Sequence, residues 1–173
     1  MSKKVKLGII GCGAMGVRHA IAASESACID LAAVADPVEE RAAALAAEHG
    51  VPKTYNDGMA LLKDPDVQAV VLALPTALRG PIALAAFAQG KHVLLEKPAA
   101  MSVQELETII AARGGLVAGS CSSRYRHLPS AAKVADFLRG DPLGPIRSVF
   151  VRDFSPAKEK PEKEKPAWRL KKD

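Results

Sequence analysis

The chain alternates short apolar runs with longer segments in which apolar residues recur at helical spacing. Runs that stay apolar throughout are typical of parallel strands covered on both faces, and the helical spacing marks the covering helices. The predicted strands are residues 5–10, 29–35, 51–55, 67–74, 92–95 and 116–120. The predicted helices are residues 17–24, 38–49, 58–62, 81–89 and 102–112.

Local signals support these boundaries. Pro37 suits the first turn of the helix at 38–49, and Gly50 follows its end. Ser102, with Glu105 three residues later, forms a capping box that begins the next helix. Strands and helices in this alternation predict a doubly wound α/β domain with a parallel sheet over residues 1–121.

The pattern changes after residue 121. A helix is predicted at 129–138, a turn cluster at 140–145 and a strand of alternating polarity at 146–154. We expect residues 122–173 to be the beginning of a second α/β domain that this chain does not complete, and therefore to be truncated.

Composition excludes several classes of protein. With 49% hydrophobic residues the chain is not a disordered polymer, and its apolar runs are shorter than the roughly 18–20 residues of a membrane span. The apolar stretch near the N-terminus breaks at Gly11, so it does not predict a signal peptide. Cys12, Cys28 and Cys121 form no spaced pair, which excludes a disulfide scaffold and a zinc ribbon. We expect a reduced, cytoplasmic protein with no metal site and no membrane partner.

The net charge of +5 does not indicate a nucleic-acid partner. Residues 152–173 hold eight Lys or Arg and five Asp or Glu, a balance of +3, which leaves the rest of the chain nearly neutral at +2. Because positive and negative side chains alternate in this segment, it makes a poor phosphate-binding surface. Aromatic residues make up only 4%, too few for a base-stacking surface.

A glycine-rich segment, GCGAMG, follows the first predicted strand and opens a helix. In a G-x-G-x-x-G loop the first glycine permits the tight turn, the second lets a pyrophosphate approach, and the third packs helix on strand. The N–H groups and dipole of the helix start favour phosphate. We predict backbone contacts with a dinucleotide at Gly11, Cys12, Gly13, Ala14, Met15 and Gly16. The alternative is a structural turn with no ligand.

Asp36 stands at the end of the second strand, twenty positions past Gly16. Its carboxylate would accept hydrogen bonds from the adenosine ribose and repel a 2′-phosphate, and Pro37 follows it in place of an arginine. These features favour NAD over NADP as the cofactor. A simple helix cap is the structural alternative, and it is compatible with the cofactor role.

Glu96-Lys97-Pro98 follows the strand at 92–95, at the sheet edge where ligands bind in open α/β sheets. Lysines at such positions are ordinarily solvated. Partly desolvated beside an oxidised nicotinamide, Lys97 could instead have a lowered pKa and exchange a proton with a substrate hydroxyl.

Four segments together are similar to the Gfo/Idh/MocA family of glucose–fructose oxidoreductase, inositol dehydrogenase and rhizopine-catabolism proteins: GIIGCGAMGVRHA, AAVADP, VVLALPT and GKHVLLEKPAA. The Glu-Lys-Pro element is the most specific of the matching motifs. Residues 122–153 resemble the family's entry into its second domain, and Ala-Trp-Arg at 167–169 resembles its Trp-Arg element. The resemblance covers essentially the whole chain.

The resemblance implies an NAD(P)-dependent oxidoreductase that transfers hydride between the cofactor and a sugar, polyol or related hydroxyl compound, and a full-length form that is a homo-oligomer. Lys97 would be the catalytic lysine. The segments that line the cofactor would be Leu74, Pro75 and Thr76, and then Glu96, Lys97 and Pro98. Arg79, where many members carry a histidine, would lie near the adenosine or phosphates.

The chain departs from the family by ending before the glycine-rich stretch, the Asp and the His that complete the active site. Its own histidines, His19, His49, His92 and His127, are expected to be structural or solvated. We therefore expect a chain that carries mainly the cofactor-binding half and is inactive alone. Two alternatives remain open: a dinucleotide-binding or sensing module without chemistry, and an interaction protein with no ligand on the glycine loop.

Overall fold

The computed structural model describes residues 4–121, 128–140, 144–145, 147–148, 150 and 152. The chain divides into two compact units, Met1–Ser122 and Ser123–Asp173. The first unit holds a sheet with helices, and the second holds one described helix, α6 (Pro129–Arg139).

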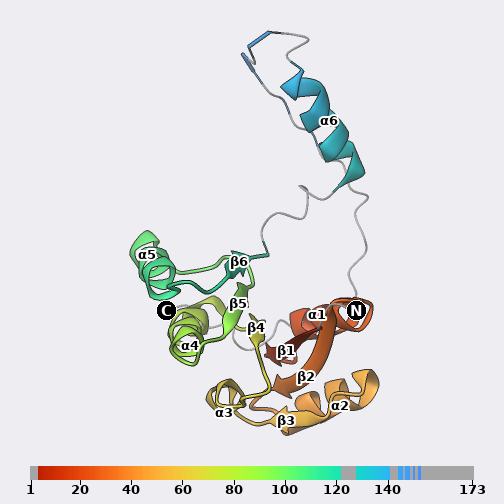
Figure 1. Cartoon of the computed structure of the whole chain (residues 1–173), viewed down its shortest axis with the longest axis vertical. Coiled ribbons are helices and arrows are strands. Elements are labelled where there is room, and N and C mark those ends of the chain that lie inside the picture. Colours follow the sequence, from red (N-terminus) through yellow and green to blue (C-terminus); the bar gives the residue numbers. More distant parts are fainter. Residues whose placement is uncertain are drawn as a thin grey trace. The chain divides into compact units, whose positions relative to one another are not determined.

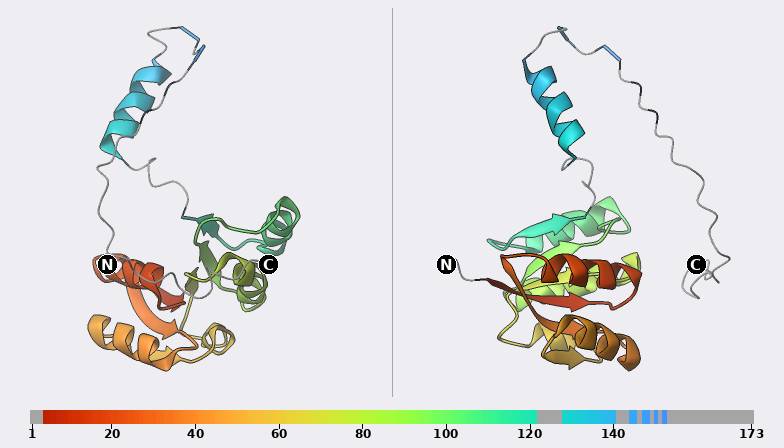
Figure 2. Two further views of the ribbon diagram at one scale, coloured as in Figure 1. Left: turned by 180° about the vertical axis from the view of Figure 1, so that it is seen from behind. Right: turned by 90° about the vertical axis from the view of Figure 1, so that its right-hand side faces the viewer.

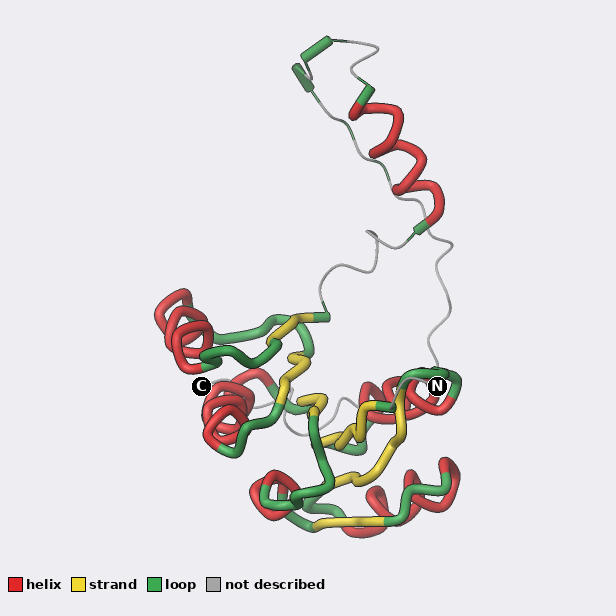
Figure 3. The backbone as a smooth tube through the Cα atoms, viewed as in Figure 1, coloured by secondary structure: helices red, strands yellow, loops and turns green. Residues whose placement is uncertain are grey.

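The first unit contains six parallel strands in the order β3-β2-β1-β4-β5-β6. Figures 1 and 3 show them side by side. The strands are β1 (Val5–Ile10), β2 (Ile29–Ala35), β3 (Lys53–Tyr55), β4 (Ala69–Leu72), β5 (His92–Leu95) and β6 (Ala118–Ser120). This order reverses direction beside β1, and in doubly wound folds that reversal creates a crevice at the carboxyl ends of the strands.

Helices cover both faces of the sheet (Figures 1 and 2). They are α1 (Ala14–Ser24), α2 (Glu39–His49), α3 (Gly58–Leu62), α4 (Thr76–Ala88) and α5 (Val103–Ala112). Adjacent strand residues point to opposite faces: Ile9 of β1 packs with α1 and α2, whereas Ile10 packs with α3 and α4. Both are at most 3% exposed. The predicted doubly wound parallel sheet is confirmed.

Four elements have the predicted bounds: β1, β2, α3 and β5. The largest difference is α4, predicted at 81–89, which begins at Thr76 and contains Pro81 in its second turn. Proline removes one helical hydrogen bond, but packing compensates, since Gly80 brings α4 so close to Glu105 of α5 that a Cβ would overlap its carboxylate. The earlier start of α4 places Arg79 in a helical turn at the carboxyl edge of the sheet.

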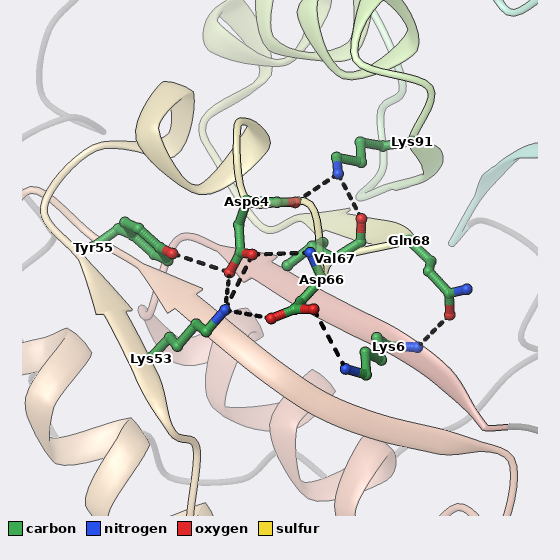
Figure 4. Close-up of polar contacts among 8 residues, drawn as sticks. All are labelled: Lys6, Lys53, Tyr55, Asp64, Asp66, Val67, Gln68 and Lys91. Carbon is green, nitrogen blue, oxygen red and sulfur yellow. Dashed lines mark hydrogen bonds and ion pairs between the residues drawn. The ribbon is translucent and has the colours of Figure 1, made fainter.

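The amino edge of the sheet is held by a polar network around Asp64 (Figure 4). Lys53 Nζ donates to both carboxylate oxygens of Asp64, at 3.1 and 3.0 Å, and Tyr55 Oη donates to one of them at 3.0 Å. Burial acts to raise the pKa of Asp64, but hydrogen bonds from the Asp66 N–H, Lys53 and Tyr55 outweigh it and lower that pKa. The buried Lys91 ammonium donates to the carbonyls of Asp64 and Val67, at 2.7 and 2.6 Å. The network therefore ties the starts of β3, β4 and β5 together.

In the second unit, α6 begins at Pro129 and ends at Arg139, one residue beyond the predicted end, with Gly140 as its C-cap residue. The strand predicted at 146–154 lies largely outside the described residues. Among the helices that the structure describes, we find none with the length and apolar character of a membrane span.

Candidate functional site

The glycine loop lies between β1 and α1, at the carboxyl edge. Gly11 has φ +98°, a conformation that side chains other than glycine rarely adopt, and a Cβ there would lie 2.5 Å from the Ala73 carbonyl oxygen. Its N–H donates to the Ala35 carbonyl at 2.7 Å. Gly16 packs so closely on the Gly11 carbonyl that a Cβ would overlap it. Both glycines therefore serve the turn itself.

Gly13 differs from its neighbours because a Cβ there would meet nothing within 4 Å. It is the N-cap residue of α1, and no side chain caps this helix. The first N–H groups of a helix have no partner inside the helix and favour an anion at its start. The open space at Gly13, beside these donors, fits a pyrophosphate, so the loop can hold the dinucleotide that the sequence predicts.

Asp36 is 6% exposed and lies at the end of β2. Its Oδ2 accepts from the Cys12 N–H at 2.8 Å and its Oδ1 accepts from the Val38 N–H at 2.9 Å. The first bond joins Asp36 to the glycine loop, and the second caps the chain ahead of α2. Asp36 thus has the structural role that the sequence allowed, and its negative charge lies beside the glycine loop.

Cys12 contributes backbone to this loop, and its side chain points inward. Its thiol is buried and lies 3.6 Å from the Ala35 carbonyl oxygen. Burial, with the Asp36 charge, raises the pKa of the Cys12 thiol to about 12. The thiol therefore stays protonated and is a poor nucleophile at neutral pH.

The segment after β4 passes the glycine loop. Leu74 is half-buried and approaches Gly11 through its side chain; a Cβ on Gly11 would lie 3.3 Å from its Cδ2. Pro75 is the N-cap residue of α4, and Thr76 begins the helix. These three residues follow a strand adjacent to β1, which brings them to the same sheet edge as the glycine loop.

Lys97 follows β5, the next strand, and its side chain is exposed. Glu96 beside it is 4% exposed, and its Oε2 accepts from the Lys97 N–H at 3.1 Å. Pro98 follows through a cis peptide bond. The Glu-Lys-Pro element therefore has a buried carboxylate and a lysine that faces solvent.

Sequence reasoning missed two residues that contact this element. His19 of α1 pairs with Glu96, Nε2 to Oε1 at 2.9 Å, and the Cys121 thiol after β6 lies within 4.8 Å of both side chains. Burial, together with Glu96, raises the pKa of the Cys121 thiol. The sequence did hold a signal for His19. It lies three residues after Gly16, and this spacing puts both residues on the same face of the helix.

His19, Glu96 and Cys121 bring a nitrogen, an oxygen and a sulfur within 4.8 Å of one another, a donor set that zinc accepts. The His19 and Glu96 atoms share a hydrogen bond, and the Arg79 guanidinium donates to the Glu96 backbone carbonyl at 2.8 Å. We describe the three side chains as a polar cluster beside the Glu-Lys-Pro element.

Arg79 lies 6% exposed beside the same element. Its guanidinium donates to backbone carbonyls at Leu74, Glu96 and Pro98. Burial lowers the pKa of Arg79, and the Glu96 charge opposes that shift. A contact between Arg79 and the adenosine or phosphates of a cofactor stays a prediction.

Comparison with known proteins gives a consistent result. Residues 5–114 match the family described as "Oxidoreductase family, NAD-binding Rossmann fold". A D-xylose 1-dehydrogenase (NADP(+)) of Haloferax volcanii is 34% identical over 82% of this chain and 44% of its own length. A levoglucosan dehydrogenase of Pseudarthrobacter phenanthrenivorans is 28% identical over 98% of this chain and 46% of its own.

Comparison with solved structures gives the same family of proteins. An NAD-binding oxidoreductase from Klebsiella pneumoniae superposes with a TM-score of 0.76 and 31% identity, over 83% of this chain and 40% of that one. The chain spans less than half the length of each of these relatives. The match over more than half of the chain, the parallel sheet and the glycine loop lead to one conclusion: the chain belongs to the Gfo/Idh/MocA family of oxidoreductases with an NAD-binding Rossmann fold.

Proposed function

We propose that the chain forms the cofactor-binding half of a nicotinamide-dependent dehydrogenase acting on a hydroxyl of a sugar, a polyol or a related compound. The observation that carries the proposal is the shared sheet edge. The open space at Gly13 and the uncapped start of α1 follow β1, the exposed Lys97 follows β5, and only β4 lies between these two parallel strands. Among the relatives, the Haloferax protein is named for a sugar, and a Bacillus subtilis protein is a scyllo-inositol 2-dehydrogenase.

In this proposal the loop from Gly11 to Gly16 holds the pyrophosphate through backbone N–H groups. Asp36 accepts from the adenosine ribose with the lone pairs that its two backbone bonds leave free. Leu74, Pro75 and Thr76 line the cofactor after β4. The nicotinamide, when bound, accepts or returns the hydride.

Lys97 is the proposed proton-transfer group. Its exposed amine projects from a main chain that Glu96 anchors, and it would take the proton from the substrate hydroxyl as hydride leaves the same carbon. Glu96 and Pro98 flank the lysine and complete the wall of the cofactor site. We propose Lys97 as the one catalytic residue in this part of the chain.

We propose NAD as the cofactor, with NADP disfavoured. The support is the negative charge of Asp36 beside the glycine loop and Pro37 after it. The relatives do not decide the choice, because the Bacillus subtilis dehydrogenase is named for NAD and the Haloferax enzyme for NADP.

We further propose that residues 1–121 form the cofactor domain and that residues 122–173 belong to a second domain for substrate and oligomer contacts. The three cysteines, all free, fit a reduced cytoplasmic compartment.

A thermal-shift titration of the chain with NAD and NADP tests the binding step. A ligand at a hundred times its dissociation constant stabilises the folded state by about 2.7 kcal/mol. NAD should therefore raise the midpoint temperature of unfolding, and NADP should raise it only at higher concentration. Failure of both to shift it would refute the proposal. Turnover with a polyol panel, in this chain and in any longer version, separates a dehydrogenase from a module that binds the dinucleotide without chemistry.

A further inference from the structure

We propose that Arg79 is a positioning residue, whose buried guanidinium fixes the main chain on both sides of Lys97. The inference rests on the proposed function, because it matters to the reaction only if Lys97 transfers the proton. Its physical content, the immobilisation of residues 96–98, can be tested separately.

Three contacts carry the proposal. Arg79 Nε donates to the Leu74 carbonyl at 2.8 Å. One terminal nitrogen, Nη1, donates to the Glu96 carbonyl at 2.8 Å and to the Pro98 carbonyl. The two carbonyls on either side of Lys97 therefore bind the same nitrogen atom, which spans the lysine as a clamp.

The remaining polar groups around Lys97 are held as well. Its own N–H donates to Glu96 Oε2 at 3.1 Å, and the other oxygen of that carboxylate pairs with His19 at 2.9 Å. The main chain at 96–98 is thus fixed from α4 and from α1, while the Lys97 side chain stays exposed. A fixed backbone with a free side chain suits an amine that must meet a substrate at a defined point.

Arginine is suited to this task and lysine is not. The guanidinium presents several N–H groups in a rigid plane, so Nε can bind one loop while Nη1 binds another. A lysine at position 79 has one nitrogen and cannot reproduce that separation. The buried charge is compensated by the three carbonyls and by Glu96, whose charge favours ionised Arg79.

The molecule offers a matched control at the opposite edge of the sheet. Lys91 is also 6% exposed, and its ammonium likewise donates to two backbone carbonyls, those of Asp64 and Val67. Replacing it removes the same kind of interaction from a place remote from Lys97. Loss of stability common to both positions can therefore be subtracted.

The experiment compares wild type with R79Q, R79K and K91M, all as the 173-residue chain. Hydrogen exchange of the Lys97 amide reports how firmly residues 96–98 are held. Trace acetylation of Lys97, measured by mass spectrometry against exposed Lys63 and with increasing NAD, reports whether the cofactor covers the lysine and at what concentration. Urea unfolding of each variant fixes conditions under which all are folded.

We expect the Lys97 amide to exchange at least about tenfold faster in R79Q and R79K, since each loses charged hydrogen bonds. In both variants the NAD concentration that protects Lys97 from acetylation should rise about tenfold, whereas K91M should match wild type in both readouts. If R79Q does not fold, R79K carries the comparison, because it keeps the charge and loses the two-loop geometry.

The outcomes separate the two ideas. Exchange of Lys97 in the Arg79 variants no faster than in K91M would overturn the positioning role, whatever NAD does. An absence of NAD protection in wild type would instead contradict the proposed place of Lys97 beside the cofactor. Fast exchange in the Arg79 variants would then still support the clamp as a structural device.

Discussion

Alanine should have different consequences at two glycines of the same loop, Gly11 and Gly13. At Gly13 the backbone, with φ −76° and ψ −167°, suits any residue, and an added Cβ meets nothing within 4 Å. At Gly11 the added Cβ would lie 2.5 Å from the Ala73 carbonyl oxygen, with φ +98°. Ordinary contacts of this kind are about 1 Å longer.

The magnitudes follow from this geometry. G11A combines left-handed strain with overpacking, together about 2–5 kcal/mol, which lowers the thermal midpoint by roughly 4–20 °C. G13A exchanges one N-cap residue for a poorer one and costs no more than about 1 kcal/mol. Its methyl group would nevertheless occupy the space proposed for the pyrophosphate, so NAD affinity should fall at least about tenfold, or about 1.4 kcal/mol.

Differential scanning fluorimetry without ligand and titration calorimetry with NAD measure the two effects separately. The expected pattern is a stable G13A that binds NAD poorly and a destabilised G11A. A G13A variant that binds NAD as wild type does would show that the open space at Gly13 is not the phosphate site. A G13A variant as unstable as G11A would contradict the loop geometry itself.

Three further predictions concern single side chains. D36A should weaken NAD binding and reduce discrimination against NADP in competitive titrations; a wild type that prefers NADP would refute the role given to Asp36. In a longer version with a complete active site, K97A should lower turnover by roughly a hundred- to ten-thousand-fold with little change in NAD affinity. Near-normal turnover would show that Lys97 is only a solvated residue at the end of a strand. D64N should destabilise the fold by about 1–3 kcal/mol at pH 7. Because the folded-state pKa of Asp64 is lowered, its stabilisation is present above the unfolded value of about 3.9 and is lost as pH falls through the folded value; urea unfolding should therefore show the two proteins converging in acid, and a constant difference would contradict this.

Two of the four elements with correctly predicted bounds, β1 and α3, have a local signal at one end. β1 ends at Ile10, just before Gly11, where the turn needs a positive φ, and α3 begins after Asp57, whose carboxylate accepts from the Met59 N–H at 3.1 Å. The early start of α4 could not be predicted in this way. Proline inside a window argues against a helix, and the close approach of Gly80 to α5 that offsets it is a tertiary contact.

The same distinction between local signals and tertiary contacts applies to the candidate site. The backbone part, from Gly11 to Gly16 with Asp36, follows from a motif in which spacing determines position. The contacts among side chains do not, because Arg79 reaches carbonyls 17 and 19 residues away and His19 reaches Glu96 across 77 residues. Which acceptor a buried guanidinium meets depends on strand order and helix packing, and no local pattern encodes it.

The hydrogen bond between Asp36 and the Cys12 N–H has a consequence for engineering this scaffold toward another cofactor. A designer who replaces the carboxylate to admit a 2′-phosphate also removes the acceptor that holds the glycine loop against β2. The replacement would leave a buried N–H without its partner, a loss of about 1–3 kcal/mol, so selectivity and rigidity cannot be changed independently at this position. A successful redesign would supply a new acceptor for the Cys12 amide before it alters the charge.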